Sequence, residues 1–164
     1  MPLTSFAFDL QGHRGARGLA PENTLAAFST ALKTGVTTLE LDVGVTADGV
    51  VVIAHDPYLN PAFTRDANGR WLSGSRGPLI RSLTFAQLQA YDVGRINQAS
   101  AYAGQFSSQQ PVDGQRIPAL SALFEMASRA GANSVRFNIE TKLNPLAPAD
   151  TVSPEVMAQA LLKV

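Results

Sequence analysis

The segment TTLELDV, residues 37–43, alternates apolar and polar side chains in the pattern that decides the fold class of this 164-residue chain. Successive side chains of an extended strand point to opposite faces of its sheet. One face therefore carries Leu39, Leu41 and Val43. The other face carries Glu40 and Asp42, which are either the solvated face of an edge strand or part of a site.

A second apolar run follows after a short turn. TADG (46–49) is a turn signal, and VVVIAHD (50–56) predicts another strand. With so short a connection, the two strands form either a hairpin or a parallel pair. Both arrangements bring His55 level with Glu40 and Asp42.

Upstream of residue 37, the pattern predicts a short strand followed by a helix. The alternating residues of that first strand are Phe6, Phe8 and Leu10. In the helix, Asn23 or Thr24 is the expected N-cap, and Gly35 ends the last turn. The inward positions of the helix are Leu25, Phe28, Ala31 and Leu32.

Downstream, helical and extended periods alternate again. ALSALFEMASRAGA (119–132) predicts an amphipathic helix, and FNIETK (137–142) predicts a strand. The inward positions of that helix are Leu120, Leu123, Phe124 and Ala127. Ser153, Pro154 and Glu155 open a last helix. Alternation of strands and helices is typical of an α/β domain.

Residues 57–117 interrupt this rhythm. They are rich in Gly, Pro, Ser, Asn and Gln, and SLTFAQLQAYD (82–92) is their one good helical start. A long stretch with few periodic apolar positions is expected to be an inserted lobe within the domain.

The composition excludes several classes of protein. Thirteen basic residues balance thirteen acidic ones, which gives no electrostatic reason to expect nucleic acid as a partner. The chain has no cysteine, so disulfides, thiolate metal sites and a cysteine nucleophile are excluded. The longest apolar runs fall far below the roughly 20 residues of a transmembrane helix. We expect a soluble protein, and both a cytoplasmic location and a periplasmic or secreted one after signal removal stay open.

Polar residues gather at the expected ends of the strands, where α/β barrels assemble their active sites. They are His13, Glu40, Asp42, His55, Glu140 and Lys142. If the apolar strand faces pack on helices, the three carboxylates point together into the barrel mouth. Their mutual repulsion and lost hydration cost several kcal/mol unless a cation neutralises them. Oxygen-only ligands favour one hard divalent ion, Mg²⁺ or Ca²⁺.

The neighbouring side chains suit a phosphodiester. Arg14 and Lys142 complement phosphate charge, while His13 and His55 supply a proton acceptor and a proton donor. By analogy with related barrel enzymes, we expect His13 to act as the base and His55 as the acid for the leaving alcohol. Neither a G-x-S-x-G nucleophile elbow nor a G-K-[ST] phosphate loop is present.

Four separated motifs resemble the glycerophosphodiester phosphodiesterase family. They are HRGARGLAPENTLAAF (13–28), ELDVGVTADGVVVIAHDPYL (40–59), RIPALSALFEMA (116–127) and NIETK (138–142). The resemblance implies a TIM-type (β/α)₈ barrel and hydrolysis of small-molecule glycerophosphodiesters to sn-glycerol 3-phosphate and an alcohol. It also implies that His13 and His55 are the acid/base pair, that Glu40, Asp42 and Glu140 hold the metal, and that Arg14 and Lys142 contact the phosphate.

Length separates this chain from a whole barrel, which takes about 250 residues. We expect residues 1–164 to supply about the N-terminal half of the domain, with four strands, and to be incomplete at the C-terminus. Such a half-barrel would expose the inner faces of VVVIA and FNIET, so pairing with a second copy or with a missing C-terminal half is expected. A related barrel phospholipase, of the sphingomyelinase D or phosphatidylinositol-specific type, and a non-catalytic binding or scaffold fragment remain as alternatives.

Overall fold

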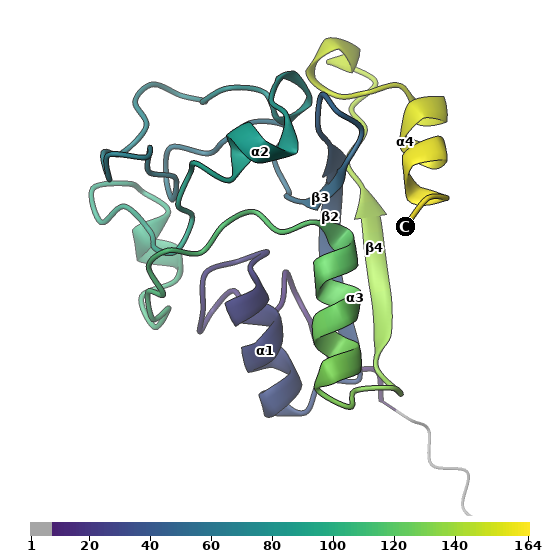
Figure 1. Ribbon diagram of the computed structural model, residues 1–164. Coiled ribbons are helices and arrows are strands. Elements are labelled where there is room, and N and C mark those ends of the chain that lie inside the picture. Colours follow the sequence, from purple (N-terminus) through teal and green to yellow (C-terminus); the bar gives the residue numbers. More distant parts are fainter. Residues whose placement is uncertain (1–7) are drawn as a thin grey trace, which may run out of the picture.

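The computed structural model describes residues 8–164, which form one sheet with helices packed on it (Figure 1). The strands are β1 (Gln11–Gly12), β2 (Thr38–Val45), β3 (Val51–Ile53) and β4 (Arg136–Thr141). The α-helices are α1 (Leu25–Thr34), α2 (Phe85–Leu88), α3 (Leu120–Arg129) and α4 (Pro154–Leu161). Three short 3₁₀ turns are η1 (Ile80–Ser82), η2 (Ala103–Gln105) and η3 (Pro148–Asp150).

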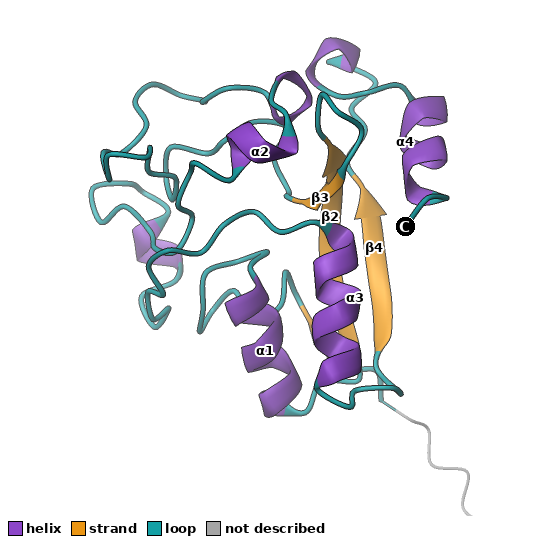
Figure 2. Ribbon diagram, viewed as in Figure 1, coloured by secondary structure: helices purple, strands orange, loops and turns teal. Residues whose placement is uncertain are grey.

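Strand β2 is the centre of the sheet. It pairs in parallel with both β1 and β4, and antiparallel with β3 (Figure 2). The β2–β3 pair is therefore the hairpin, and only three of the four predicted strands are parallel. The backbone N–H of Ala54 donates to the carbonyl of Asp42 at 2.9 Å. The hairpin thus returns the chain to the level of Asp42 just before His55, as both predicted arrangements required.

The first strand is shorter than its alternation predicts. Phe6 lies outside the described residues, and Phe8 is 83% exposed. Pairing with β2 is confined to Gln11 and Gly12. It ends there because the backbone turns sharply, and a Cβ on Gly12 would lie 2.6 Å from the carbonyl oxygen of Gly15.

Helix α1 begins and ends at its predicted caps, and α4 begins at its predicted cap. The Thr24 hydroxyl, rather than the Asn23 side chain, caps α1 by accepting from Ala27 N, and Gly35 ends the helix at φ 87°. Ser153 caps α4 in the same way. Helices α1 and α3 lie side by side against the sheet (Figure 1). The α/β alternation is therefore confirmed.

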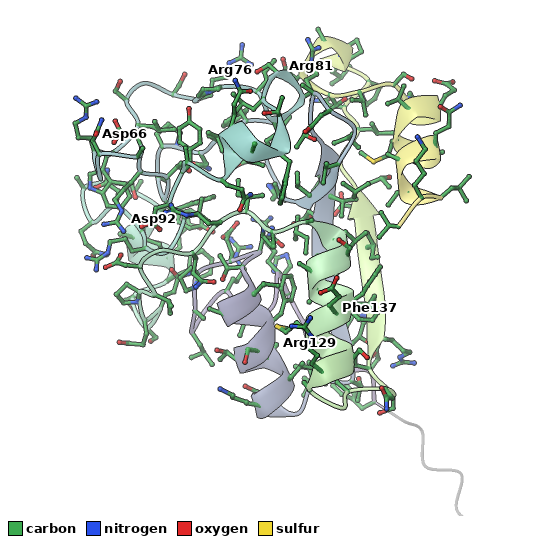
Figure 3. The ribbon with its side chains drawn as sticks, in the orientation of Figure 1. Asp66, Arg76, Arg81, Asp92, Arg129 and Phe137 are labelled. Atoms are coloured by element: carbon green, nitrogen blue, oxygen red, sulfur yellow. The ribbon has the colours of Figure 1, made fainter. Side chains whose placement is uncertain are left out.

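The main core lies between the sheet and these helices. It buries the apolar face of β2 together with Phe28, Ala31, Leu120 and Leu123. Phe137 of β4 packs edge-on against Phe124 of α3, with ring centroids 4.9 Å apart (Figure 3). Because the apolar face of β2 is consumed by this core, Glu40 and Asp42 lie on the opposite face.

Residues 57–117 are mostly loop and carry a second apolar cluster (Figure 2). Val52 of β3 packs there with Leu59, Ile80, Leu88, Val93 and Ile117. The expectation that the VVVIA strand exposes an apolar face is wrong, because Val51, Val52 and Ile53 are all at most 3% exposed between the two clusters. In β4, by contrast, every residue is exposed or half-buried. No helix among residues 8–164 is long and apolar enough to span a membrane.

Candidate active site

The loop between β1 and α1 places His13 and Arg14 beside Glu40 of β2. Arg14 has φ 50°, a region that a non-glycine residue occupies only when its surroundings hold it there. Its backbone N–H donates to Glu40 Oε2 at 2.8 Å. Gly15 follows at φ 81°, and a Cβ there would lie 2.7 Å from the backbone of Ala27. Only glycine fits this position, so the loop is pinned between β2 and α1.

Three carboxylates meet beside this loop. Glu40 and Asp42 share one face of β2, and Glu140 of β4 lies opposite Asp42 in the parallel register. One oxygen of each carboxylate falls within 4.8 Å of the other two. Asp42 is 1% exposed, whereas Glu140 is open to solvent. The residues that the sequence singled out as metal ligands are therefore brought together.

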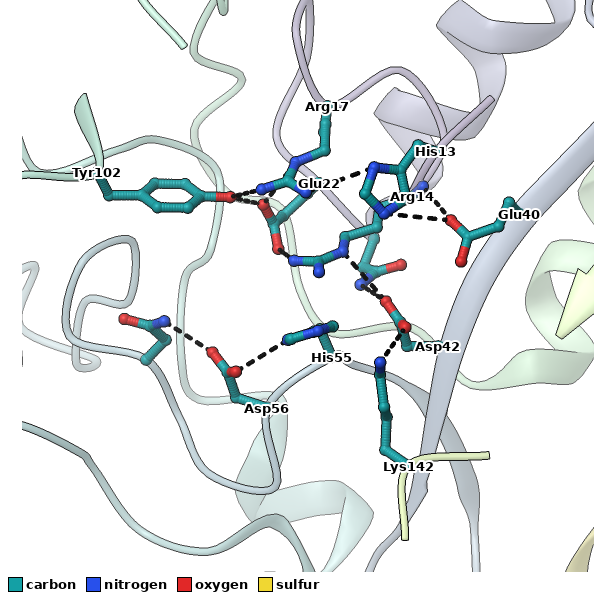
Figure 4. Close-up of polar contacts among 12 residues, drawn as sticks. His13, Arg14, Arg17, Glu22, Glu40, Asp42, His55, Asp56, Tyr102 and Lys142 are labelled. Carbon is teal, nitrogen blue, oxygen red and sulfur yellow. Dashed lines mark hydrogen bonds and ion pairs between the residues drawn. The ribbon is translucent and has the colours of Figure 1, made fainter. Parts of the chain in front are cut away.

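Two cations neutralise part of this charge. Arg14 Nε lies 3.3 Å from Asp42 Oδ2, and Lys142 Nζ lies 3.1 Å from Asp42 Oδ1 (Figure 4). Lys142 Nζ also lies 2.7 Å from Glu140 Oε1. Burial disfavours the charged form of Lys142, but hydrogen bonds from its ammonium to the two carboxylates outweigh burial and raise its pKa. Lys142 is therefore held in its cationic form beside Asp42.

Sequence reasoning missed two residues that hold this arrangement. Glu22, only 7% exposed, accepts from Arg14 Nη1 at 2.8 Å. Asn23, at φ 55°, donates from Nδ2 to Asp42 Oδ2 at 3.2 Å. Both residues belong to the PEN segment (21–23), which was interpreted from the sequence only as the start of a helix.

His13 stands at the exposed rim of the site. Its Nε2 lies 3.8 Å from Glu40 Oε2, and its Nδ1 lies 3.4 Å from Arg17 Nη1. Its side chain is 57% exposed, so solvent and small molecules reach the ring.

His55 is fixed from one side. Its Nδ1 lies 2.9 Å from Asp56 Oδ1, and Asn60 Nδ2 donates to the other carboxylate oxygen of Asp56 at 2.7 Å (Figure 4). Burial raises the pKa of Asp56, but hydrogen bonds from His55 and Asn60 outweigh burial and lower it. Asp56 therefore stays ionised and orients the ring. The sequence reasoning missed both partners, although Asp56 is adjacent to His55 in the chain.

The site therefore combines three carboxylates, two cations and two imidazoles on one face of a mixed sheet. Oxygen donors within reach of one another suit a hard divalent cation. Fixed cations beside them suit an oxyanion such as a phosphate. Imidazoles near that position suit proton transfer in both directions.

The whole of this site lies within the match to one protein family. Residues 13–164 match the glycerophosphoryl diester phosphodiesterase family, and the chain belongs to it. A glycerophosphodiester phosphodiesterase of Caldanaerobacter subterraneus is 32% identical over 130 residues, which are 79% of this chain and 43% of that protein.

Solved structures of the family have the same fold. One from Silicibacter pomeroyi, assigned as a glycerophosphoryl diester phosphodiesterase, is 36% identical with a TM-score of 0.83, covering 93% of this chain and 51% of its own. A phosphodiesterase from Oleispira antarctica, solved in complex with the product sn-glycerol-3-phosphate, is 30% identical with a TM-score of 0.63, covering 97% and 53%. The chain has the fold of about half of a TIM-type barrel, and it spans about half the length of these solved structures.

Proposed function

We propose that this protein hydrolyses glycerophosphodiesters to sn-glycerol 3-phosphate and an alcohol. Family membership supports the reaction class, and the product bound to the Oleispira antarctica protein supports the substrate class. The observation that carries the proposal is the meeting of Glu40, Asp42 and Glu140 beside Arg14 and Lys142.

A divalent metal fits the carboxylate group. All three side chains offer oxygen, and Asp42 is buried between the cationic side chains of Arg14 and Lys142. We propose Mg²⁺ or Ca²⁺ as the ion, held by Glu40, Asp42 and Glu140. When bound, the metal would polarise the phosphate oxygens and screen their charge from the carboxylates.

The cationic side chains would bind and orient the phosphate. Arg14 is held on two sides by Glu22 and Asp42, so its guanidinium is fixed before substrate arrives. Lys142 places an ammonium at the neighbouring strand end. Fixed donors lower the entropic cost of placing the phosphorus atom for attack.

The histidines would move the protons. We propose that His13 takes a proton from the attacking water or substrate hydroxyl as its oxygen bonds to phosphorus and the phosphorus–oxygen bond to the alcohol breaks. Attack by water gives sn-glycerol 3-phosphate directly, whereas attack by a substrate hydroxyl gives a cyclic phosphate that water then opens to the same product. His55 would give a proton to the departing alcohol oxygen. The contact between Asp56 Oδ1 and His55 Nδ1 orients the imidazole ring for this transfer.

Phosphorus NMR of glycerophosphocholine tests the proposal without coupling enzymes. The protein is incubated with Mg²⁺, with Ca²⁺ and with excess chelator. We expect the diester signal to be replaced by that of sn-glycerol 3-phosphate only with metal. Turnover that persists in chelator contradicts the metal requirement. A diester signal unchanged under every condition contradicts the proposed activity, and a different phosphorus product indicates the related phospholipase chemistry.

A further inference from the structure

Tyr102 connects the 57–117 lobe to the β1–α1 loop through contacts that the proposed reaction does not use. The hydroxyl of Tyr102, in the turn before η2, accepts from Arg17 Nη2 at 2.9 Å. The same hydroxyl donates to Glu22 Oε2 (Figure 4). One lobe residue thus joins the two charged side chains that flank Arg14 and His13.

The lobe is fastened to this loop at further points. Gln109 Nε2 donates to the carbonyl of Arg17 at 2.7 Å, and Gln110 N donates to the carbonyl of Leu19 at 2.9 Å. Arg17 also lies over the ring of Phe106, 4.3 Å from its centroid. These contacts fix residues 102–110 against the loop, so the Tyr102 hydroxyl is held in one place.

Glu22 transmits this contact to the phosphate-binding side chain. Its side chain is 4% exposed, and its Oε1 accepts from Arg14 Nη1 at 2.8 Å. A buried carboxylate with a partner on each oxygen is held in place, because turning the side chain away would leave a charged oxygen unpaired. The Tyr102 hydroxyl supplies the partner on the second oxygen, with Arg17 Nε 3.6 Å away.

We propose that Tyr102 is a positioning residue for Arg14. Acting through Glu22, it holds the guanidinium at the angle that receives the phosphate group. The lobe would thereby set the affinity of the site for a phosphate monoester or diester without touching it. This inference rests on the proposed function only in taking Arg14 as the phosphate-binding residue.

The test compares Tyr102→Phe with Tyr91→Phe. Tyr102→Phe removes one oxygen and keeps the ring that packs against Phe63 and Phe106, at 5.7 and 5.0 Å between centroids. Tyr91 lies in the same lobe, and its hydroxyl forms no hydrogen bond with residues 8–164, so Tyr91→Phe is a matched control. The two readouts are the Nε–Hε NMR signal of Arg14 and the dissociation constant for sn-glycerol 3-phosphate with Mg²⁺ present.

We expect Tyr102→Phe to move the Arg14 signal and to weaken binding of sn-glycerol 3-phosphate about three- to tenfold, the equivalent of one net hydrogen bond. Tyr91→Phe should change neither. An unmoved Arg14 signal and unchanged affinity in Tyr102→Phe, even with a lower melting temperature, would overturn the inference, since the contact would then only fasten the lobe. If wild-type protein fails to bind sn-glycerol 3-phosphate, the proposed function fails, while the Arg14 signal alone still decides whether Tyr102 controls this side chain.

Discussion

Replacing Glu140 with glutamine separates metal binding from folding. Glu140 is one of three carboxylates able to share an ion, yet its side chain is 58% exposed and its ion pair is with Lys142. Exposed ion pairs contribute about 0–1 kcal/mol, and Lys142 keeps Asp42 as a partner. Glu140→Gln should therefore change the stability of the metal-free protein by less than about 1 kcal/mol.

The metal-dependent part of stability should respond far more. An ion at 100 times its dissociation constant stabilises the wild-type fold by about 2.7 kcal/mol. For a domain of this size, that shift raises the melting temperature by roughly 5–11 °C. Loss of a direct ligand weakens the affinity at least about 100-fold, as removal of outer-shell partners already costs 10–100-fold. At the same metal concentration, metal should stabilise the Glu140→Gln variant by only about 0.4 kcal/mol. That stabilisation corresponds to a rise in melting temperature of roughly 1–2 °C.

Thermal unfolding followed by circular dichroism measures both quantities, in chelator and in titrated Mg²⁺ or Ca²⁺. The matched control is Glu125→Gln on α3, because Glu125 is 65% exposed, pairs with Arg129 at 3.3 Å and lies outside the carboxylate group. It should keep the full metal response. The same metal response in Glu140→Gln as in wild type, or no response in wild type at millimolar metal, would refute the proposed site.

Three further predictions follow from other parts of the molecule. His13→Ala and His55→Ala should each lower the rate of hydrolysis at least about 100-fold with the fold intact. If His55 is the acid, a substrate with a better leaving group should restore the rate of His55→Ala but not that of His13→Ala. Hydrogen bonds from Thr38, Gln11 and Thr37 lower the pKa of Asp9 to about 2, so its contribution to stability is present above its ordinary pKa of 3.8 and is lost as the pH falls toward 2. Asp9→Asn should remove that part of the acid-induced fall in melting temperature, and an identical pH profile in wild type and variant would contradict it. Among residues 8–164 one edge of β4 has no partner strand, so sedimentation should detect association of this chain, and a monodisperse monomer of 17.4 kDa would contradict that expectation.

The sequence was sufficient for the class of fold and for the members of the carboxylate group. Alternation in β2 places Glu40 and Asp42 on one face regardless of the rest of the chain, because side-chain direction in a strand is local. Caps and helical spacing are local too, so α1 and α3 begin and end close to their predicted positions, and α4 begins at its predicted cap. The family motifs lie in these same local elements.

Tertiary structure decided what depends on contacts between distant segments. The strand that leads to His55 is a short antiparallel return rather than a barrel strand, because β2 already pairs in parallel with β1 and β4. Val51 and Ile53 are buried in the main core, and Val52 is buried because the 57–117 segment supplies a second apolar cluster that no periodic pattern predicted. The partners of Arg14 and Arg17 come from positions as distant as Tyr102, 85 residues from Arg17. Hydrogen bonds between such residues require the folded chain, since their directions depend on how the lobe docks against the β1–α1 loop and not on spacing along the sequence.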